Sequence, residues 1–169
     1  MASALPEVWL RGPLPHVPPL LQPIAHALLQ AREELSALMN DFPNELLWQR
    51  PAGVASVGFH LQHLTGVLDR LFTYAAGDAL NENQWQYLKR EGVEADDLTA
   101  DVLVDKFRHQ VEHSIRLLIE MGDARLTDHR AVGRAGLPST VIGLLTHAAE
   151  HTMRHTGQLL VTVKILRNA

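Results

Sequence analysis

Three histidines follow one another at intervals of four residues near the C-terminal end of the chain, as His147, His151 and His155 in LLTHAAEHTMRHTGQLL (144–160). In a helix, a step of four residues turns the side chain by only about 40°, so the three rings lie on one broad face. Two imidazoles at this spacing can bind one divalent metal ion at about 2.0–2.1 Å. His151 and His155 lie on the apolar stripe of this helix, whereas His147 lies at its edge. The spacing therefore indicates a metal site on His151 and His155.

A second pair of histidines, His60 and His63, occurs in SVGFHLQHLTGVLDRLF (56–72) and is spaced by three residues. On a helix the two rings face the same general direction. One imidazole from this segment would complete a three-histidine site with an open coordination position, which a catalytic metal needs. The apolar pattern places His60 nearer the centre of the buried stripe, but periodicity alone leaves open which of the two is the ligand.

Long helices must position these histidines. Apolar residues recur at helical spacing in four segments, which predicts helices at about 20–40, 57–76, 99–121 and 139 to near the C-terminus. Ser56 and Thr99 are suitable N-terminal caps, and Gly77 and Gly122 are suitable ends. A short polar helix is expected at 81–91. Four prolines make residues 1–18 an irregular arm, and Pro19 follows directly. No segment has the alternating pattern of a strand. We expect an all-α four-helix bundle that occupies residues 1–169 as a single domain.

Composition narrows the chemistry and the partners. The 169 residues are 46% hydrophobic and 20% charged, and they include ten histidines but no cysteine. A metal must therefore be held by nitrogen or oxygen ligands, and any thiol in the reaction must come from a small molecule. The net charge of −4 and the absence of a basic cluster argue against nucleic acid as a partner. We find no secretory signal and no membrane-spanning run, and we expect a cytoplasmic protein.

The two histidine motifs, SVGFHLQHL (56–64) and HAAEHTMRHTGQL (147–159), resemble those of the DinB-like (DinB/YfiT) metalloenzyme superfamily. That family has a histidine seven residues after a serine at the start of the second helix, and H-x-x-x-H-x-G-Q in the last long helix. The resemblance implies that His63, His151 and His155 are the metal ligands and that Gly157 and Gln158 complete the signature. It also implies an up-down bundle with a long crossover, often as a homodimer.

The resemblance implies zinc, nickel or a similar divalent ion, and thiol-dependent transfer is among the known activities of the family. A bound ion could activate a water, as in a hydrolase, or a thiol cosubstrate. His60 and His147 are candidate bases for the released proton and are otherwise expected at the rim or as partners of the ligands. Gln158 is a candidate for orienting a ligand histidine or a water. We expect Gly157 to allow close helix packing.

Two other interpretations remain from the sequence. In one, the chain is a non-catalytic or stress-associated bundle, in which the metal only joins two helices. In the other, it is a helical interaction protein without a metal. His109 and His113 repeat the spacing of four residues, but they flank the apolar stripe of their segment. We expect those two histidines to lie on a solvated face.

Overall fold

The computed structural model describes residues 5–168. Residues 1–4 of the predicted arm and residue 169 of the predicted domain lie outside the described part. It contains five α-helices and one two-stranded sheet within that range: α1 (Gln22–Leu38), α2 (Val57–Ala76), α3 (Glu82–Arg90), α4 (Ala100–Met121), β1 (His129–Val132), β2 (Leu137–Thr140) and α5 (Val141–Arg167). Short 3-10 turns occur in the N-terminal arm and before α2, at Val8–Arg11, Pro19–Leu21, Asn44–Leu46 and Pro51–Gly53. The chain is therefore all-α apart from one small hairpin.

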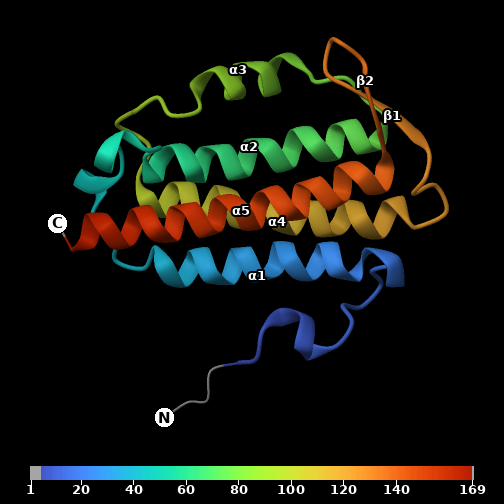
Figure 1. The fold of residues 1–169 in the computed structure, drawn as a ribbon, viewed down its shortest axis with the longest axis horizontal. Coiled ribbons are helices and arrows are strands. Elements are labelled where there is room, and N and C mark those ends of the chain that lie inside the picture. Colours follow the sequence, from blue (N-terminus) through green and yellow to red (C-terminus); the bar gives the residue numbers. More distant parts are fainter. Residues whose placement is uncertain (1–4, 169) are drawn as a thin grey trace.

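The four long helices form a bundle in which α2 packs against α5 and α4, and α1 packs against the same two helices. Figure 1 shows that α2 and α4 run in the same direction, whereas α1 and α5 run in the opposite one. Two parallel helices cannot be joined by a tight turn, so the chain crosses the length of the bundle between them, and this connection carries α3. The expected bundle with a long crossover is confirmed.

Side-chain caps explain why the helices begin where they do. The Ser56 hydroxyl accepts a hydrogen bond from the Phe59 N–H at 3.1 Å, and Thr99 does the same for the Val102 N–H at 3.3 Å. Gly77 ends α2 in the left-handed conformation, with φ of +97°. The helix that carries His60 and His63 thus has the predicted bounds.

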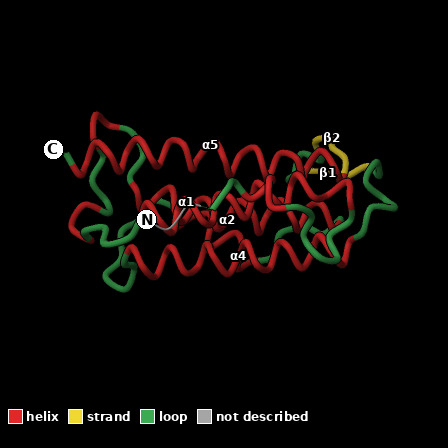
Figure 2. The backbone as a smooth tube through the Cα atoms, turned by 90° about the horizontal axis from the view of Figure 1, so that it is seen from below, coloured by secondary structure: helices red, strands yellow, loops and turns green. Residues whose placement is uncertain are grey.

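The hairpin between α4 and α5 was not expected from the sequence. Strands β1 and β2 pair antiparallel, with Arg130 opposite Ser139, and they lie at one end of the bundle (Figure 2). Each strand has only four residues, too few to show an alternating apolar pattern. Ser139 belongs to β2, so the last helix begins two residues later than predicted, with Thr140 as its cap.

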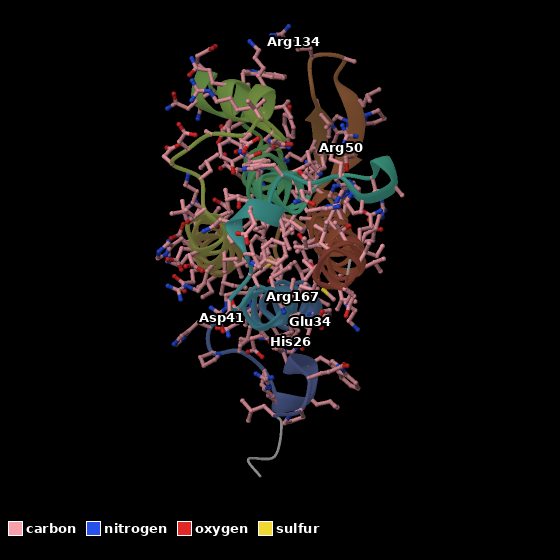
Figure 3. All side chains as sticks on the ribbon, turned by 90° about the vertical axis from the view of Figure 1, so that its left-hand side faces the viewer. His26, Glu34, Asp41, Arg50, Arg134 and Arg167 are labelled. Atoms are coloured by element: carbon pink, nitrogen blue, oxygen red, sulfur yellow. The ribbon has the colours of Figure 1, made fainter. Side chains whose placement is uncertain are left out.

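One continuous core of apolar side chains fills the space between the long helices. The end-on view in Figure 3 shows α1 below this core, α4 and α5 on either side, and α3 with the hairpin above. The N-terminal arm crosses α1 and buries Val8 and Val17. Within residues 5–168, no helix combines the length and the apolar character that a membrane crossing requires.

Candidate metal centre

The packing of α2 against α5 brings three histidines together. Ring nitrogens of His63, His151 and His155 all lie within 4.8 Å of one another. The ring centroid of His155 is 4.6 Å from that of His63 and 4.5 Å from that of His151. One ring therefore comes from the first third of α2, and two come from successive turns of α5. This is the trio that the sequence motifs single out, and it contains His63 rather than His60.

A buried ion pair orients the His63 ring. Nδ1 of His63 lies 2.7 Å from Oε2 of Glu91, and the other Glu91 oxygen accepts from Arg70 at 2.6 Å. The Glu91 and Arg70 side chains are only 5% and 10% exposed. Because a carboxylate only accepts, Nδ1 of His63 donates to Glu91. Nε2 of the same ring then faces His151. Carboxylate–histidine pairs of this kind fix the ring orientation of a metal ligand and raise its basicity.

His60 has a corresponding role beside His155. It is 4% exposed, and its Nδ1 lies 3.1 Å from Nδ1 of His155. This contact uses one nitrogen of His155 and leaves Nε2 of that ring free for an ion. His60 is thus buried behind the trio rather than at the rim, in contact with one ring of the trio.

The surroundings keep His60, His151 and His155 neutral at neutral pH. Burial, with a smaller contribution from the nearby His63 ring, lowers the pKa of His60 to about 4. Burial and the neighbouring imidazoles lower the pKa of His151 and of His155 to about 4 as well. Neutral imidazole is the form that binds a metal. At neutral pH, His151 and His155 are therefore already in the protonation state that metal binding requires.

Gly66 and Phe59 complete the surroundings of His63. A Cβ atom at Gly66 would lie 2.5 Å from Oε1 of Glu91 and 2.6 Å from Nη1 of Arg70, so the buried ion pair needs glycine at this position of α2. The Phe59 ring is stacked on the His63 ring at 5.3 Å between centroids, with the planes 8° apart. The stacked Phe59 ring limits the rotation of His63, and Gly66 leaves room for the ion pair that binds it.

The donor set fits a divalent ion. Nε2 of His63 and Nε2 of His151 are 2.9 Å apart. Two imidazole nitrogens on one tetrahedral ion at about 2.0–2.1 Å stand about 3.3 Å apart, so a shift of a few tenths of an ångström accommodates the ion. Nδ1 of His151 is buried and has no hydrogen-bond partner among the described residues. His151 is thus held by the trio itself, because it lacks the outer partner that His63 and His155 have.

The structure places the other predicted site residues as follows. The His147 side chain is 50% exposed and lies at the solvent edge next to His151, with 5.1 Å between ring centroids. Gln158 is exposed, and its side chain makes no hydrogen bond within the described residues. Gly157 is also exposed, and a Cβ there would meet nothing within 4 Å, so the expected close helix packing at Gly157 is wrong. His109 and His113 are exposed, as predicted.

Sequence reasoning missed Glu91, Arg70 and Gly66. Arg70 lies seven residues after His63, on the same face of α2, and an isolated glycine in a helical pattern is a recognisable signal of close approach. Nothing in the sequence around Glu91 indicates that it reaches His63, because it comes from the crossover and the contact depends on the tertiary fold.

A cavity of about 340 Å³ lies next to two residues that contact His63, although no histidine of the trio lines it. Phe59 and Glu91, which both contact His63, line it together with Arg50, Ala55, Ser56 and Gly92. Its volume is in the range of small-molecule sites. A polar ligand in this cavity would lie next to the residues that orient His63.

Comparison with known protein families identifies the family of the chain. The family model described as the DinB superfamily matches residues 27–159 of the 169 residues of the chain. The search of curated proteins found no match to the chain. The matched region begins in α1 and ends in α5 beyond His155, so it includes the whole histidine trio. From the extent of this match, the chain belongs to the DinB superfamily.

Proposed function

We propose that the protein is a divalent-metal-dependent enzyme in which His63, His151 and His155 hold the ion. The single observation that carries the proposal is the convergence of these three rings within 4.8 Å, from two different helices. Three imidazoles leave at least one coordination position for a water or a substrate, whereas structural zinc sites usually have four protein ligands. Zinc or nickel is the ion that we favour from the resemblance to the DinB-like superfamily, since imidazole nitrogen by itself suits zinc, nickel, copper and iron alike.

The outer partners support a functional rather than an accidental cluster. Glu91 and Arg70 fix the tautomer of His63, and Nδ1 of His60 contacts Nδ1 of His155. Burying a carboxylate and a guanidinium costs free energy that their mutual attraction often only balances. An ion pair buried against a histidine is therefore explained better by the orientation of that histidine than by stability alone.

The reaction that we favour is transfer to or from a small thiol. A bound divalent ion would supply Lewis-acid chemistry, which lowers the pKa of a thiol or a water that reaches it. The chain has no cysteine, so the thiol is a low-molecular-weight cosubstrate. The cavity lined by Phe59 and Glu91 offers room for such a molecule, and the Arg50 guanidinium on its wall would complement a negatively charged group.

Metal content tests the proposal. Protein purified without added metal and without a tag, then titrated with zinc or nickel, should bind one equivalent. The double variant His151→Ala/His155→Ala should bind none and should keep the helical circular dichroism of the wild type. His109→Ala/His113→Ala is a matched control, because it removes two exposed histidines at the same spacing from α4. A wild-type protein that takes up no divalent ion would contradict the proposal.

Cobalt substitution tests the finer proposal of a thiol cosubstrate. In protein loaded with Co²⁺, a thiol such as cysteamine or glutathione should produce a thiolate-to-cobalt charge-transfer band in the near ultraviolet. The same thiol methylated on sulfur serves as the control. A spectrum that responds to neither compound, in a protein that binds one equivalent of cobalt, would argue for an ion that only joins α2 and α5.

A further inference from the structure

A second group of potential ligands lies directly outside the histidine trio. Ligand atoms of His147, Glu150 and His151 all lie within 4.8 Å of one another. His151 belongs to both groups. The outer group is on the solvent side of α5, where the His147 and Glu150 side chains are 50% and 47% exposed. The inner group is more buried, and the His63 side chain is only 17% exposed.

The sequence pattern alone does not produce this convergence. The spacing H-x-x-E-H occurs twice in the chain, as His147, Glu150 and His151 on α5 and as residues 109, 112 and 113 on α4. In both copies of the pattern, Nδ1 of the first histidine lies 3.5 Å from Oε2 of the glutamate. Within residues 5–168, however, the α4 residues form no three-ligand group.

The difference between the two patterns lies in the last histidine. His151 is half-buried, and its Nε2 is held by Nε2 of His63 at 2.9 Å. His113 is exposed and has no such contact among the described residues. The contact with the inner trio therefore fixes the ring of His151, and this brings it within reach of His147 and Glu150.

We propose that His147, Glu150 and His151 form an outer cation site that captures a divalent ion from solvent and passes it to His63 and His155. The inference rests on the proposed function, because it needs the inner site as the destination. His151 is common to both groups, so an ion can exchange His147 and Glu150 for His63 and His155 one at a time without leaving the reach of the His151 ring. The ion never has to enter the half-buried site without ligands.

The charges around the outer site favour capture over retention. One carboxylate oxygen of Glu150 faces His147, and the other accepts from the guanidinium of Arg154. The carboxylate attracts cations, but Arg154 competes for it and is itself a positive charge next to the site. An outer site with one shared carboxylate and two imidazoles should therefore bind more weakly than the inner one, as transfer inward requires.

The test is the rate of metal uptake by the metal-free full-length protein. Zinc is supplied as its complex with a weak coloured chelator, and the loss of that colour is followed by stopped-flow absorbance. We expect His147→Ala and His147→Gln to load about tenfold more slowly than the wild type, since they remove one ligand of the outer site. Their final content should still be one equivalent. His109→Ala, which removes the matched exposed histidine of α4, should load at the wild-type rate.

The outcomes separate this inference from the proposed function. Equal loading rates for wild type, His147→Ala and His147→Gln, with one equivalent bound in each, would overturn the outer site and leave the inner one intact. A wild type that binds no zinc would overturn both. Slower loading in His109→Ala as well would also overturn the inference, because any surface histidine would then have the same effect.

Discussion

Glu91 is the residue through which the crossover acts on the metal centre, and its replacement gives the sharpest prediction about how the site works. Glu91 accepts from Nδ1 of His63 through one oxygen and from Arg70 through the other. Glu91→Ala removes both contacts. Glu91→Gln keeps the size of the side chain but not its chemistry. Because both neighbours are donors, the amide NH₂ of a glutamine must face one of them, and one hydrogen bond is lost in either orientation.

The expected magnitudes follow from burial. Loss of the outer partner of a metal ligand typically weakens metal affinity by about 10–100-fold. We therefore expect the Kd for zinc to rise by about this factor in Glu91→Ala, and by about tenfold in Glu91→Gln. The Glu91 and Arg70 side chains are 5% and 10% exposed, so Glu91→Ala also leaves a buried guanidinium unpaired. That should lower the free energy of unfolding of the metal-free protein by about 3 kcal/mol.

Two assays separate these effects. Competition with a chelator of known affinity gives the Kd for zinc, and urea denaturation of the metal-free protein gives the free energy of unfolding. Glu94→Gln is the control, because Glu94 is exposed and lies three residues further along the same connection. If both Glu91 variants bind zinc as tightly as the wild type while folded, the orientation of His63 by Glu91 has no role in metal binding and the reasoning is refuted.

Three further predictions follow from the same surroundings. Gly66→Ala should weaken zinc binding and lower the melting temperature, since its Cβ would come 2.5 Å from Glu91; an unchanged zinc Kd would show that the ion pair can move without cost. Gly157→Ala should raise the free energy of unfolding, measured by urea denaturation, by about 0.5–1 kcal/mol, because alanine favours an exposed helix and its Cβ meets nothing within 4 Å. A decrease in this free energy would mean that something covers this face of α5. In the metal-free protein the pKa of His60 is lowered from 6.5 to about 4, so the unfolded chain binds a proton first as the pH falls. The free energy of unfolding should therefore be fully present above about pH 6.5 and should decline toward about pH 4, less steeply in His60→Gln; equal slopes would contradict the pKa.

The arrangement of the helices and the trio could be predicted because their signals are local. Ser56 and Gly77 mark the ends of α2, and both caps depend only on residues within one turn of the helix. The histidines of α5 are related by helical geometry, which spacing alone determines. The choice between His60 and His63 needed the family motif, because two residues three positions apart both face α5. The structure shows both in contact with rings of α5, His63 with His151 and His60 with His155.

The outer partners could not be predicted, since they depend on contacts between distant segments. Glu91 follows α3, 28 residues after His63, and its burial results from the path of the crossover. The hairpin before α5 was missed for a related reason. Its strands are stabilised by pairing with each other and by the Arg130 side chain, which donates to the Ala75 carbonyl at 2.8 Å. Neither contact leaves a pattern in a window of a few residues.

The central claim is that one divalent ion binds between α2 and α5, and anomalous diffraction from crystals of the zinc-loaded protein tests it most directly. Data collected on both sides of the zinc absorption edge locate the ion without reference to its ligands. We predict one fully occupied position about 2.0–2.1 Å from a ring nitrogen of each of His63, His151 and His155. An ion held by His60 in place of His63, a full site only at His147 and Glu150, or no zinc in this region would contradict it.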